Sequence, residues 1–228
     1  MISTDKFLAQ IIDNGANGYG IAKQDGLVCF VPFSISGEKV LIHTKKFGKN
    51  FCECVLDEVV SPSPRRVTPQ CPYFEKCGGC VLQHMDQNSQ LEYKTNQVKT
   101  ILQRALKKDL STNFCISKNS YHYRNKLSFT IVNNKLCFAD VDGNFFPVQN
   151  CPLFACDLTQ IIEVVNKYLS TTKNNFRAFH VRLLDGCYQF VFVSDSYDFP
   201  ASMQLINAFL QKNIKFSLNL CKNTQKNS

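Results

Sequence analysis

Residues 71–80 of the sequence read Cys71-Pro72-Tyr73-Phe74-Glu75-Lys76-Cys77-Gly78-Gly79-Cys80. Three thiols fall in this stretch with the spacing C-x5-C-x2-C, and the two adjacent glycines let the backbone approach a small bound group closely. Thiolates are soft ligands, and a run with no second C-x2-C pair is not typical of a zinc ribbon. The spacing therefore favours an iron-sulfur cluster with a distant fourth ligand over the alternatives of zinc binding and inert packing.

The fourth ligand is predicted to be Cys151, because Asn150-Cys151-Pro152 repeats the Cys-Pro step at the start of the run. A Cys-Pro step also occurs at the distant ligand of ferredoxin-type runs. His84 lies beside the run and is the alternative ligand. Other cysteines lie in stretches with a strand or helix pattern, where a thiol usually packs in a core: Cys115, Cys137 and Cys156.

The stretch from Cys71 to His84 resembles the iron-sulfur signature of bacterial RNA (uracil-C5)-methyltransferases, C-P-Y-F-x-x-C-G-G-C-x-x-Q-H. The resemblance implies a 4Fe-4S cluster and the methylation of rRNA or tRNA from S-adenosylmethionine. It also implies a TRAM domain, an OB-like RNA-binding module, at the front of the chain. Further stretches occur in the family's order: residues 15–20, Ser36-Gly37-Glu38, Ser63-Pro64-Arg65-Arg66, Gln90-Leu91 with Lys94, Tyr123 to Ser128, and Cys151-Pro152.

The catalytic part of the family's pattern does not occur in these 228 residues. In the family a Rossmann-like domain binds S-adenosylmethionine with a Gly-rich loop, and the Cys of a Ser-Cys-Asn-Pro-like motif attacks uracil C6. We therefore expect the chain to be a truncated, RNA-gripping N-terminal portion, with the cofactor site and the nucleophile in a part beyond it or encoded separately. A standalone iron-sulfur redox protein and a non-catalytic RNA-binding module are the alternatives.

Composition indicates a protein with reduced thiols and a polyanionic partner. Of the 228 residues 44% are hydrophobic, which is enough for ordinary cores. Twelve cysteines would indicate disulfides in a short secreted chain, but no apolar signal segment is present, so we expect a cytoplasmic monomer away from membranes. The net charge is +8, and residues 1–60 carry six Lys and Arg against seven Asp and Glu, so the positive excess lies beyond them. Such an excess suits RNA.

The pattern of the chain predicts an α+β protein in three parts. Residues 1–60 contain five short β runs between turn signals, which predicts a small OB-like β-barrel. Residues 61–110 form a Pro-rich linker, the cluster loop and a helix with an apolar core face. Residues 111–228 read as an antiparallel α+β domain with its helices on one face of the sheet. The antiparallel α+β domain that follows the barrel is expected to carry the iron-sulfur cluster. A Rossmann-like methyltransferase domain is expected to be absent.

Four basic residues are predicted to contact RNA. Arg65 and Arg66 lie at the middle of the Pro-rich linker. The run from Tyr121 to Ile131 alternates, so that Arg124 and Lys126 share one polar face with Ser128 and Thr130 while apolar residues line the other. A solvated linker and a solvated sheet face are the alternatives for these residues.

Overall fold

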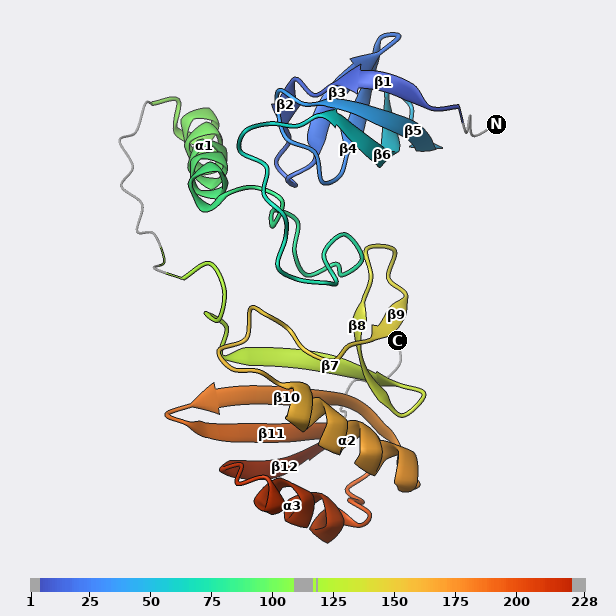
Figure 1. The fold of residues 1–228 in the computed structure, drawn as a ribbon, viewed down its shortest axis with the longest axis vertical. Coiled ribbons are helices and arrows are strands. Elements are labelled where there is room, and N and C mark those ends of the chain that lie inside the picture. Colours follow the sequence, from blue (N-terminus) through green and yellow to red (C-terminus); the bar gives the residue numbers. More distant parts are fainter. Residues whose placement is uncertain (1–4, 109–116, 118, 223–228) are drawn as a thin grey trace. The chain divides into compact units, whose positions relative to one another are not determined.

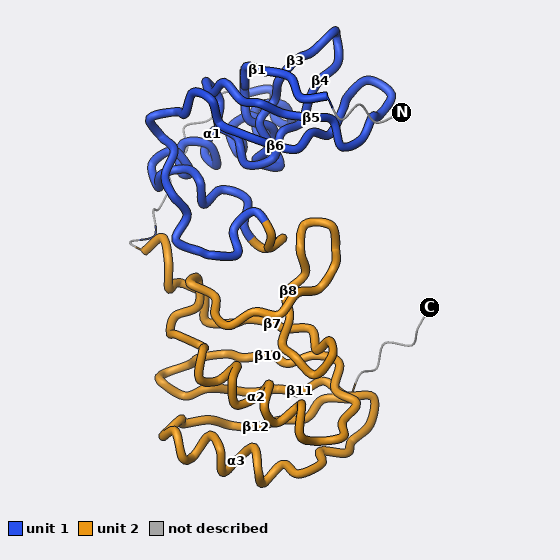
Figure 2. The backbone as a smooth tube through the Cα atoms, turned by 45° about the vertical axis from the view of Figure 1, so that its right-hand side comes forward, with its two compact units in different colours: residues 1–75, 80–117 blue, residues 76–79, 118–228 orange. Residues whose placement is uncertain are grey.

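The computed structural model describes residues 5–108, 117 and 119–222 (Figure 1). The chain divides into two compact units (Figure 2). Unit 1 comprises residues 1–75 and 80–117, and unit 2 comprises residues 76–79 and 118–228. Within the described ranges, no helix is long and apolar enough to cross a membrane. The division into residues 1–60, 61–110 and 111–228 stays a prediction.

Unit 1 is built on a six-stranded sheet. Its strands are β1 (Phe7–Gln10), β2 (Asp13–Asn14), β3 (Gly20–Gln24), β4 (Leu27–Val31), β5 (Lys39–Phe47) and β6 (Phe51–Ser61). They lie in the order β1-β5-β6-β4-β3-β2, and β4 pairs with β6 in parallel while every other neighbour is antiparallel. Small and β-branched side chains fill the core beneath them, among them Ala22, Val31, Val40 and Ile42.

The single described helix of unit 1 is α1 (Gln87–Leu106). It begins at the N-cap Asp86, whose carboxylate accepts a hydrogen bond from Ser89 N at 2.9 Å, because the first N–H groups of a helix lack partners inside it. Tyr93 anchors the helix by donating its hydroxyl to Gly15 O at 2.6 Å. The expected core face is not formed among the described residues, since Val98 and Ile101 are exposed.

Unit 2 contains a second six-stranded sheet and two helices. Its elements are β7 (Lys126–Val132), β8 (Lys135–Ala139), β9 (Phe145–Pro147), α2 (Thr159–Thr171), β10 (Phe176–Leu184), β11 (Cys187–Ser194), α3 (Ser202–Gln211) and β12 (Phe216–Lys222). The strand order is β12-β11-β10-β7-β8-β9. Asn133-Asn134 and Asp185-Gly186 turn two of the hairpins with positive φ, as their sequences predict.

Both helices of unit 2 cover the same face of its sheet (Figure 1). Tyr168 of α2 meets Phe192 edge-on at 6.2 Å between ring centroids, and Phe209 of α3 stacks on Phe190 at 4.7 Å. Phe190 and Phe192 are two residues apart on β11 and therefore point to one face of the sheet. The opposite face of the central strands is left without a helix among the described residues.

The predicted fold class is wrong in its two main parts. Residues 1–60 were expected to form an OB-like barrel, but the strands from Phe7 to Ser61 form a six-stranded mixed sheet in which β6 returns beside β4 in parallel. The following sheet was expected to be an antiparallel α+β domain that carries the cluster, but β12 pairs with β11 in parallel. The physical reason is that α3 acts as a crossover, which returns the chain in the direction of the preceding strand. Alternation and turn signals predict where each strand lies in the sequence, but they do not predict which strands pair or in which direction.

Candidate functional site

The cysteine-rich loop is held locally by backbone hydrogen bonds. In unit 2, Cys77 forms an isolated antiparallel bridge with Asp140, and Gly78 N donates to Ala139 O at 3.1 Å. A Cβ on Gly78 would lie 3.1 Å from Asp140 O, so a side chain at this position would require the neighbouring backbone to shift by a few tenths of an ångström. Gly79 N donates to Cys77 Sγ at 3.4 Å. A backbone N–H aimed at sulfur suits a thiolate ligand, because hydrogen bonds to the charged form stabilise it.

Cys151 lies in a loop that the preceding asparagine organises. Asn150 Oδ1 accepts hydrogen bonds from Cys151 N at 2.8 Å and from Leu158 N at 3.1 Å. Asn150 Nδ2 donates to the Asp157 carboxylate at 2.8 Å, and Phe154 N donates to Cys151 O at 3.0 Å. The loop before α2 therefore presents a half-buried Cys151 from a defined backbone.

The predicted ligands are distributed over both units. Cys71 and Cys80 belong to unit 1, and Cys77 and Cys151 belong to unit 2; all four are half-buried. Whether the four thiols share one cluster stays a prediction. Among the weaker candidates, Cys137 is buried, Cys156 is exposed, and Cys115 lies outside the described residues.

His84, the alternative ligand, is a buried side chain of unit 1. It is 1% exposed and packs against the rings of Phe33 and Phe74, at 6.4 and 5.7 Å between centroids, and these two rings also contact each other at 5.2 Å. Neither ring nitrogen has a hydrogen-bond partner in the described part of the chain. Burial, and then the positive charge of Arg66, lower the pKa of His84 to about 4. The imidazole is therefore neutral at physiological pH.

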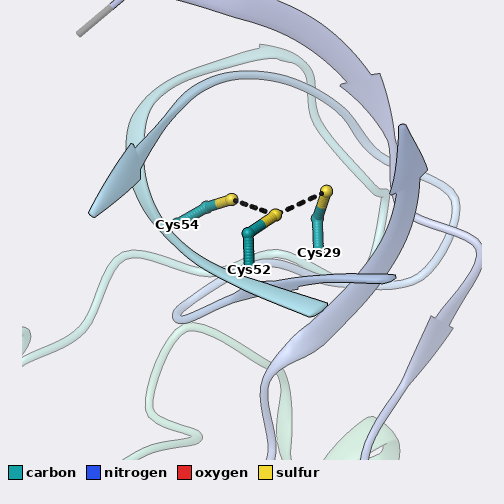
Figure 3. Close-up of side chains that lie close together, drawn as sticks. All are labelled: Cys29, Cys52 and Cys54. Atoms are coloured by element: carbon teal, nitrogen blue, oxygen red, sulfur yellow. Dashed lines mark hydrogen bonds between the residues drawn. The ribbon is translucent and has the colours of Figure 1, made fainter. Parts of the chain in front are cut away.

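The structure brings together three thiols that the sequence did not single out. Cys29, Cys52 and Cys54 converge inside unit 1, with all three sulfur atoms within 4.8 Å of one another (Figure 3). One signal was readable in the sequence, because Cys52 and Cys54 are two residues apart in a predicted strand and so share a face. Their approach to Cys29 depends on the parallel pairing of β4 with β6, which the pattern did not indicate.

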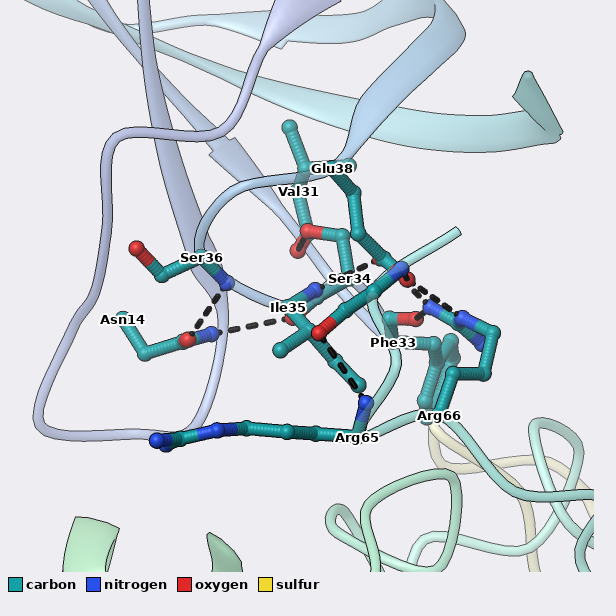
Figure 4. A network of polar contacts seen from close by, with 10 residues as sticks. Asn14, Val31, Phe33, Ser34, Ile35, Ser36, Glu38, Arg65 and Arg66 are labelled. Atoms are coloured by element: carbon teal, nitrogen blue, oxygen red, sulfur yellow. Dashed lines mark hydrogen bonds and ion pairs between the residues drawn. The ribbon is translucent and has the colours of Figure 1, made fainter. Parts of the chain in front are cut away.

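Arg66 is held in a buried ion pair (Figure 4). Its Nε and Nη2 donate to the two carboxylate oxygens of Glu38 at 2.6 and 2.8 Å, and Nη2 also donates to Phe33 O. The side chains are 20% and 0% exposed. Burial opposes ionisation of Glu38, but the hydrogen bonds from Arg66, Ser63 N and Ile35 N and the charge of Arg66 lower the pKa of this carboxyl below its usual value. The pair joins two of the stretches that carry the family resemblance.

Arg65, the neighbouring residue, extends away from Arg66 in Figure 4. Its guanidinium pairs with Glu92 at 2.7 Å, and both side chains are 54% exposed. An exposed pair of this kind is weak, so Arg65 can exchange its carboxylate partner for a phosphate at little cost. The RNA contacts of Arg65 and Arg66 stay predictions.

The strand predicted to carry Arg124 and Lys126 is shorter than expected. Strand β7 begins at Lys126, while Arg124 lies before it and pairs with Phe154 in an isolated parallel bridge. The predicted alternation is confirmed within β7, where Leu127 and Phe129 are buried and Lys126 is exposed. Both basic residues are exposed to solvent.

Lys126 lies directly opposite Arg182 of the adjacent antiparallel strand β10. Like charges at directly opposite positions destabilise a sheet. Ser128 lies opposite His180 in the next row, and the charge of Lys126 is, after burial, the second cause that lowers the pKa of His180.

We define the open sheet face as the residues that point away from the helices on four strands: Lys126, Ser128, Thr130, Val132, Ala178, His180, Arg182, Leu184, Cys187, Gln189, Val191, Val193, Ser217, Asn219 and Cys221. None of these described residues is a carboxylate.

Comparison with known proteins gives RNA methyltransferases as homologues. The chain is 32% identical over 174 residues to the 23S rRNA (uracil(1939)-C(5))-methyltransferase RlmD of Shewanella amazonensis, a match that covers 73% of this chain and 39% of the relative. It is 30% identical over 174 residues to an uncharacterized RNA methyltransferase of Caldanaerobacter subterraneus, covering 73% and 38%. A third, from Clostridium tetani, is 30% identical over 211 residues, covering 85% and 46%. No protein-family model matches the chain.

The chain therefore spans less than half the length of these relatives. Among solved structures, it is similar to the tRNA (uracil-54, C5)-methyltransferase of Pyrococcus abyssi, determined in complex with S-adenosyl-L-homocysteine. The TM-score is 0.70 at 22% identity, over 96% of this chain and 52% of that chain. This likeness shows the fold. It also argues against the predicted fold class of an OB-like barrel followed by an antiparallel α+β domain that carries a cluster. The three relatives are all named as RNA methyltransferases, and the Shewanella protein is named for C5 of a uracil in 23S rRNA.

Proposed function

We propose that this chain is the RNA-binding portion of an S-adenosylmethionine-dependent RNA (uracil-C5)-methyltransferase that forms 5-methyluridine in rRNA or tRNA. In this proposal the protein is located in the cytoplasm and binds RNA as a monomer. Its homologues are named as RNA methyltransferases, and some of them are named for C5 of uracil. The observation that carries the RNA-binding role is the opposed pair Lys126 and Arg182 on the open sheet face.

The opposed pair is explained by an anionic partner. Two cations at directly opposite positions repel each other, and none of the described residues of the open sheet face can neutralise them. Phosphate groups remove this repulsion, since each can accept charge-assisted hydrogen bonds from Lys or Arg. Exposed Arg124 precedes the same strand and extends the positive surface. Hydroxyl and amide groups on the face, such as Ser128 and Asn219, add hydrogen-bonding capacity.

The proposed cofactor of this portion is a 4Fe-4S cluster held by Cys71, Cys77, Cys80 and Cys151. The donor set fits, because four thiolates are the usual ligands of such a cluster. The local geometry also fits: Gly79 N donates to Cys77 Sγ, and Gly78 sits where a side chain would meet the backbone. When bound, the cluster would supply a covalent tie between distant stretches of the chain, which couples metal binding to folding.

Methyl transfer is proposed to require sequence beyond these 228 residues. The matched relatives are more than twice as long as the part that this chain covers, and the Ser-Cys-Asn-Pro motif of the resembled family does not occur here. In this proposal S-adenosylmethionine binds to that further part, and the present portion holds the RNA while the target uridine is turned out for reaction.

The RNA-binding role is tested with two charge-matched double variants. Lys126→Ala with Arg182→Ala removes two cations from the open sheet face. Lys167→Ala with Lys212→Ala removes two exposed cations from the helix side of the same unit. Each neutralised phosphate of a single strand contributes about −0.7 to the slope of log K against log salt, so the first variant should make this slope shallower by about 1.4. Binding to an rRNA fragment is measured by fluorescence anisotropy at several salt concentrations.

The two variants separate a specific surface from a general charge effect. The proposal expects weaker binding and a shallower slope for the first variant and near wild-type behaviour for the second. If both variants bind RNA like the wild type, or if both lose the same affinity, the open sheet face is not the RNA surface.

A further inference from the structure

Three buried thiols meet in the core of unit 1 (Figure 3). Cys29 of β4 and Cys52 of β6 are direct partners in the parallel ladder, and Cys54 lies two residues further along β6 on the same face. Cys52 Sγ lies 3.2 Å from Cys29 Sγ and 3.7 Å from Cys54 Sγ. The three residues are between 0% and 2% exposed. We call Cys29, Cys52 and Cys54 the thiol triad.

The spacing of the thiol triad is close to that of a three-coordinate metal site. A metal–sulfur bond is about 2.3 Å long, so three sulfur atoms around one ion in a plane stand about 4.0 Å apart. The observed separations of 3.2 and 3.7 Å, with the third within 4.8 Å, need shifts of less than about 1 Å to reach that arrangement. All three sulfur atoms also point toward one another from two strands (Figure 3).

The donor set selects the kind of metal. Of the described histidine, cysteine and carboxylate side chains, no fourth joins the thiol triad as a ligand. Structural zinc is almost always four-coordinate, and magnesium and calcium take oxygen ligands. Soft ions such as Cu(I) prefer sulfur. We propose that the thiol triad is a buried three-sulfur site that binds one soft, thiophilic metal ion, namely Cu(I).

The surroundings decide how the ion is held. Each thiol that becomes a ligand releases its proton to solvent, and Cu(I) keeps its oxidation state. Apolar neighbours such as Val31 and Ile42 shield the bound ion from water.

The parallel ladder between β4 and β6 provides a route for the ion. It contains three residue pairs, and the pair Cys29–Cys52 is the central one. This ladder is the middle pairing of the sheet, so the sulfur atoms become accessible only when the sheet opens locally at its centre, and such local openings need less free energy than global unfolding. We therefore expect slow loading and slow release of the ion.

The experiment uses the full chain without oxygen and Cu(I) as the probe. In a background with Cys71, Cys77, Cys80 and Cys151 each changed to Ser, a chromophoric Cu(I) chelator competes for the ion. The proposal expects one tightly held Cu(I) per chain, with the luminescence of a water-shielded Cu(I)–thiolate centre. Changing the three residues of the thiol triad to Ala should abolish both signals.

A matched control removes three thiols that do not meet. In the same background, Cys137→Ala, Cys187→Ala and Cys221→Ala should leave the single Cu(I) in place, since none of these three belongs to a group of close metal-ligating side chains among the described residues. If the four-serine background does not fold, as judged by circular dichroism, the comparison is made in the wild-type chain, where the triad variant should hold one Cu(I) fewer than the control. Equal Cu(I) content and equal chelator resistance in triad and control variants would overturn the proposal.

Discussion

Replacing Arg66 by Met is expected to destabilise unit 1 by about 3 kcal/mol at pH 7. The variant keeps an unbranched apolar stem in place of that of arginine but leaves the Glu38 carboxylate, which is fully buried, without its cation. Removing one partner of a buried pair costs roughly 3–5 kcal/mol, and the 20% exposure of Arg66 places this pair at the lower end. Arg65→Met is the matched control, because its pair with Glu92 is exposed and should contribute about 0–1 kcal/mol.

The assay is urea unfolding followed by hydrogen exchange of peptides from β1 to β6, which reports on unit 1 alone. With a slope of about 1–3 kcal/mol per M urea, the midpoint for Arg66→Met should fall by about 1–3 M. Adding Glu38→Leu should restore part of the loss, since it removes the unpaired buried charge but also removes the acceptor of Ile35 N and Ser63 N. Equal midpoints for Arg66→Met and Arg65→Met would refute the reasoning.

The same pair predicts a pH dependence with a definite sign. The pKa of Glu38 is lowered in the folded protein, so its contribution to stability is present above its unfolded pKa of about 4.3 and is lost as the pH falls through the folded pKa. Without Arg66, the hydrogen bonds from Ser63 N and Ile35 N still lower the pKa of Glu38, but burial, the largest single cause, raises it, so the carboxyl takes up a proton more readily than in the wild type. The stability deficit of Arg66→Met should therefore be smaller at pH 5 than at pH 7.

Three further predictions concern the buried His84, the iron-sulfur cluster and methyl transfer. The pKa of His84 is about 4 in the folded protein and about 6.5 when unfolded, so the free energy of unfolding of the wild type should fall by roughly 3 kcal/mol between pH 6.5 and 4. In urea titrations at several pH values, His84→Phe should lose this dependence on pH. An unchanged dependence would contradict the low pKa of His84. Anaerobically purified protein should be brown with about four iron and four sulfide per chain, and Cys151→Ser but not Cys137→Ser should bleach it; a colourless protein with one zinc would refute the cluster. The 228-residue chain should incorporate no labelled methyl from S-adenosylmethionine into unmodified rRNA or tRNA, and measurable incorporation would contradict the proposed division of labour.

Much of the local structure could be predicted from the sequence. Alternation placed Leu127 and Phe129 inside and Lys126 outside, and paired turn residues such as Asp185-Gly186 marked the hairpins. The order β-β-α-β-β-α-β from residue 136 onward also follows from periods of two and of about 3.6. These features depend on neighbours in the chain, which a sequence displays directly.

The pairings between distant segments could not be predicted in the same way. The parallel ladders β4–β6 and β11–β12 depend on which strands meet after a long connection, and alternation is the same for either direction. The thiol triad, the pair of Glu38 with Arg66, and the opposition of Lys126 to Arg182 all follow from such pairings. For this reason the sequence marked Arg66 as a candidate for RNA contact, whereas the structure gives its guanidinium a buried carboxylate partner.

The most direct test of the RNA-binding role is photo-crosslinking of the intact chain to an rRNA fragment that contains 4-thiouridine, with the crosslinked peptides identified by mass spectrometry. We predict crosslinks on peptides from β7 and β10 that contain Lys126, His180 or Arg182, because these side chains share the open sheet face. Excess unlabelled RNA should remove these crosslinks. Crosslinks confined to α2 and α3, on the opposite side of the same sheet, would contradict the account.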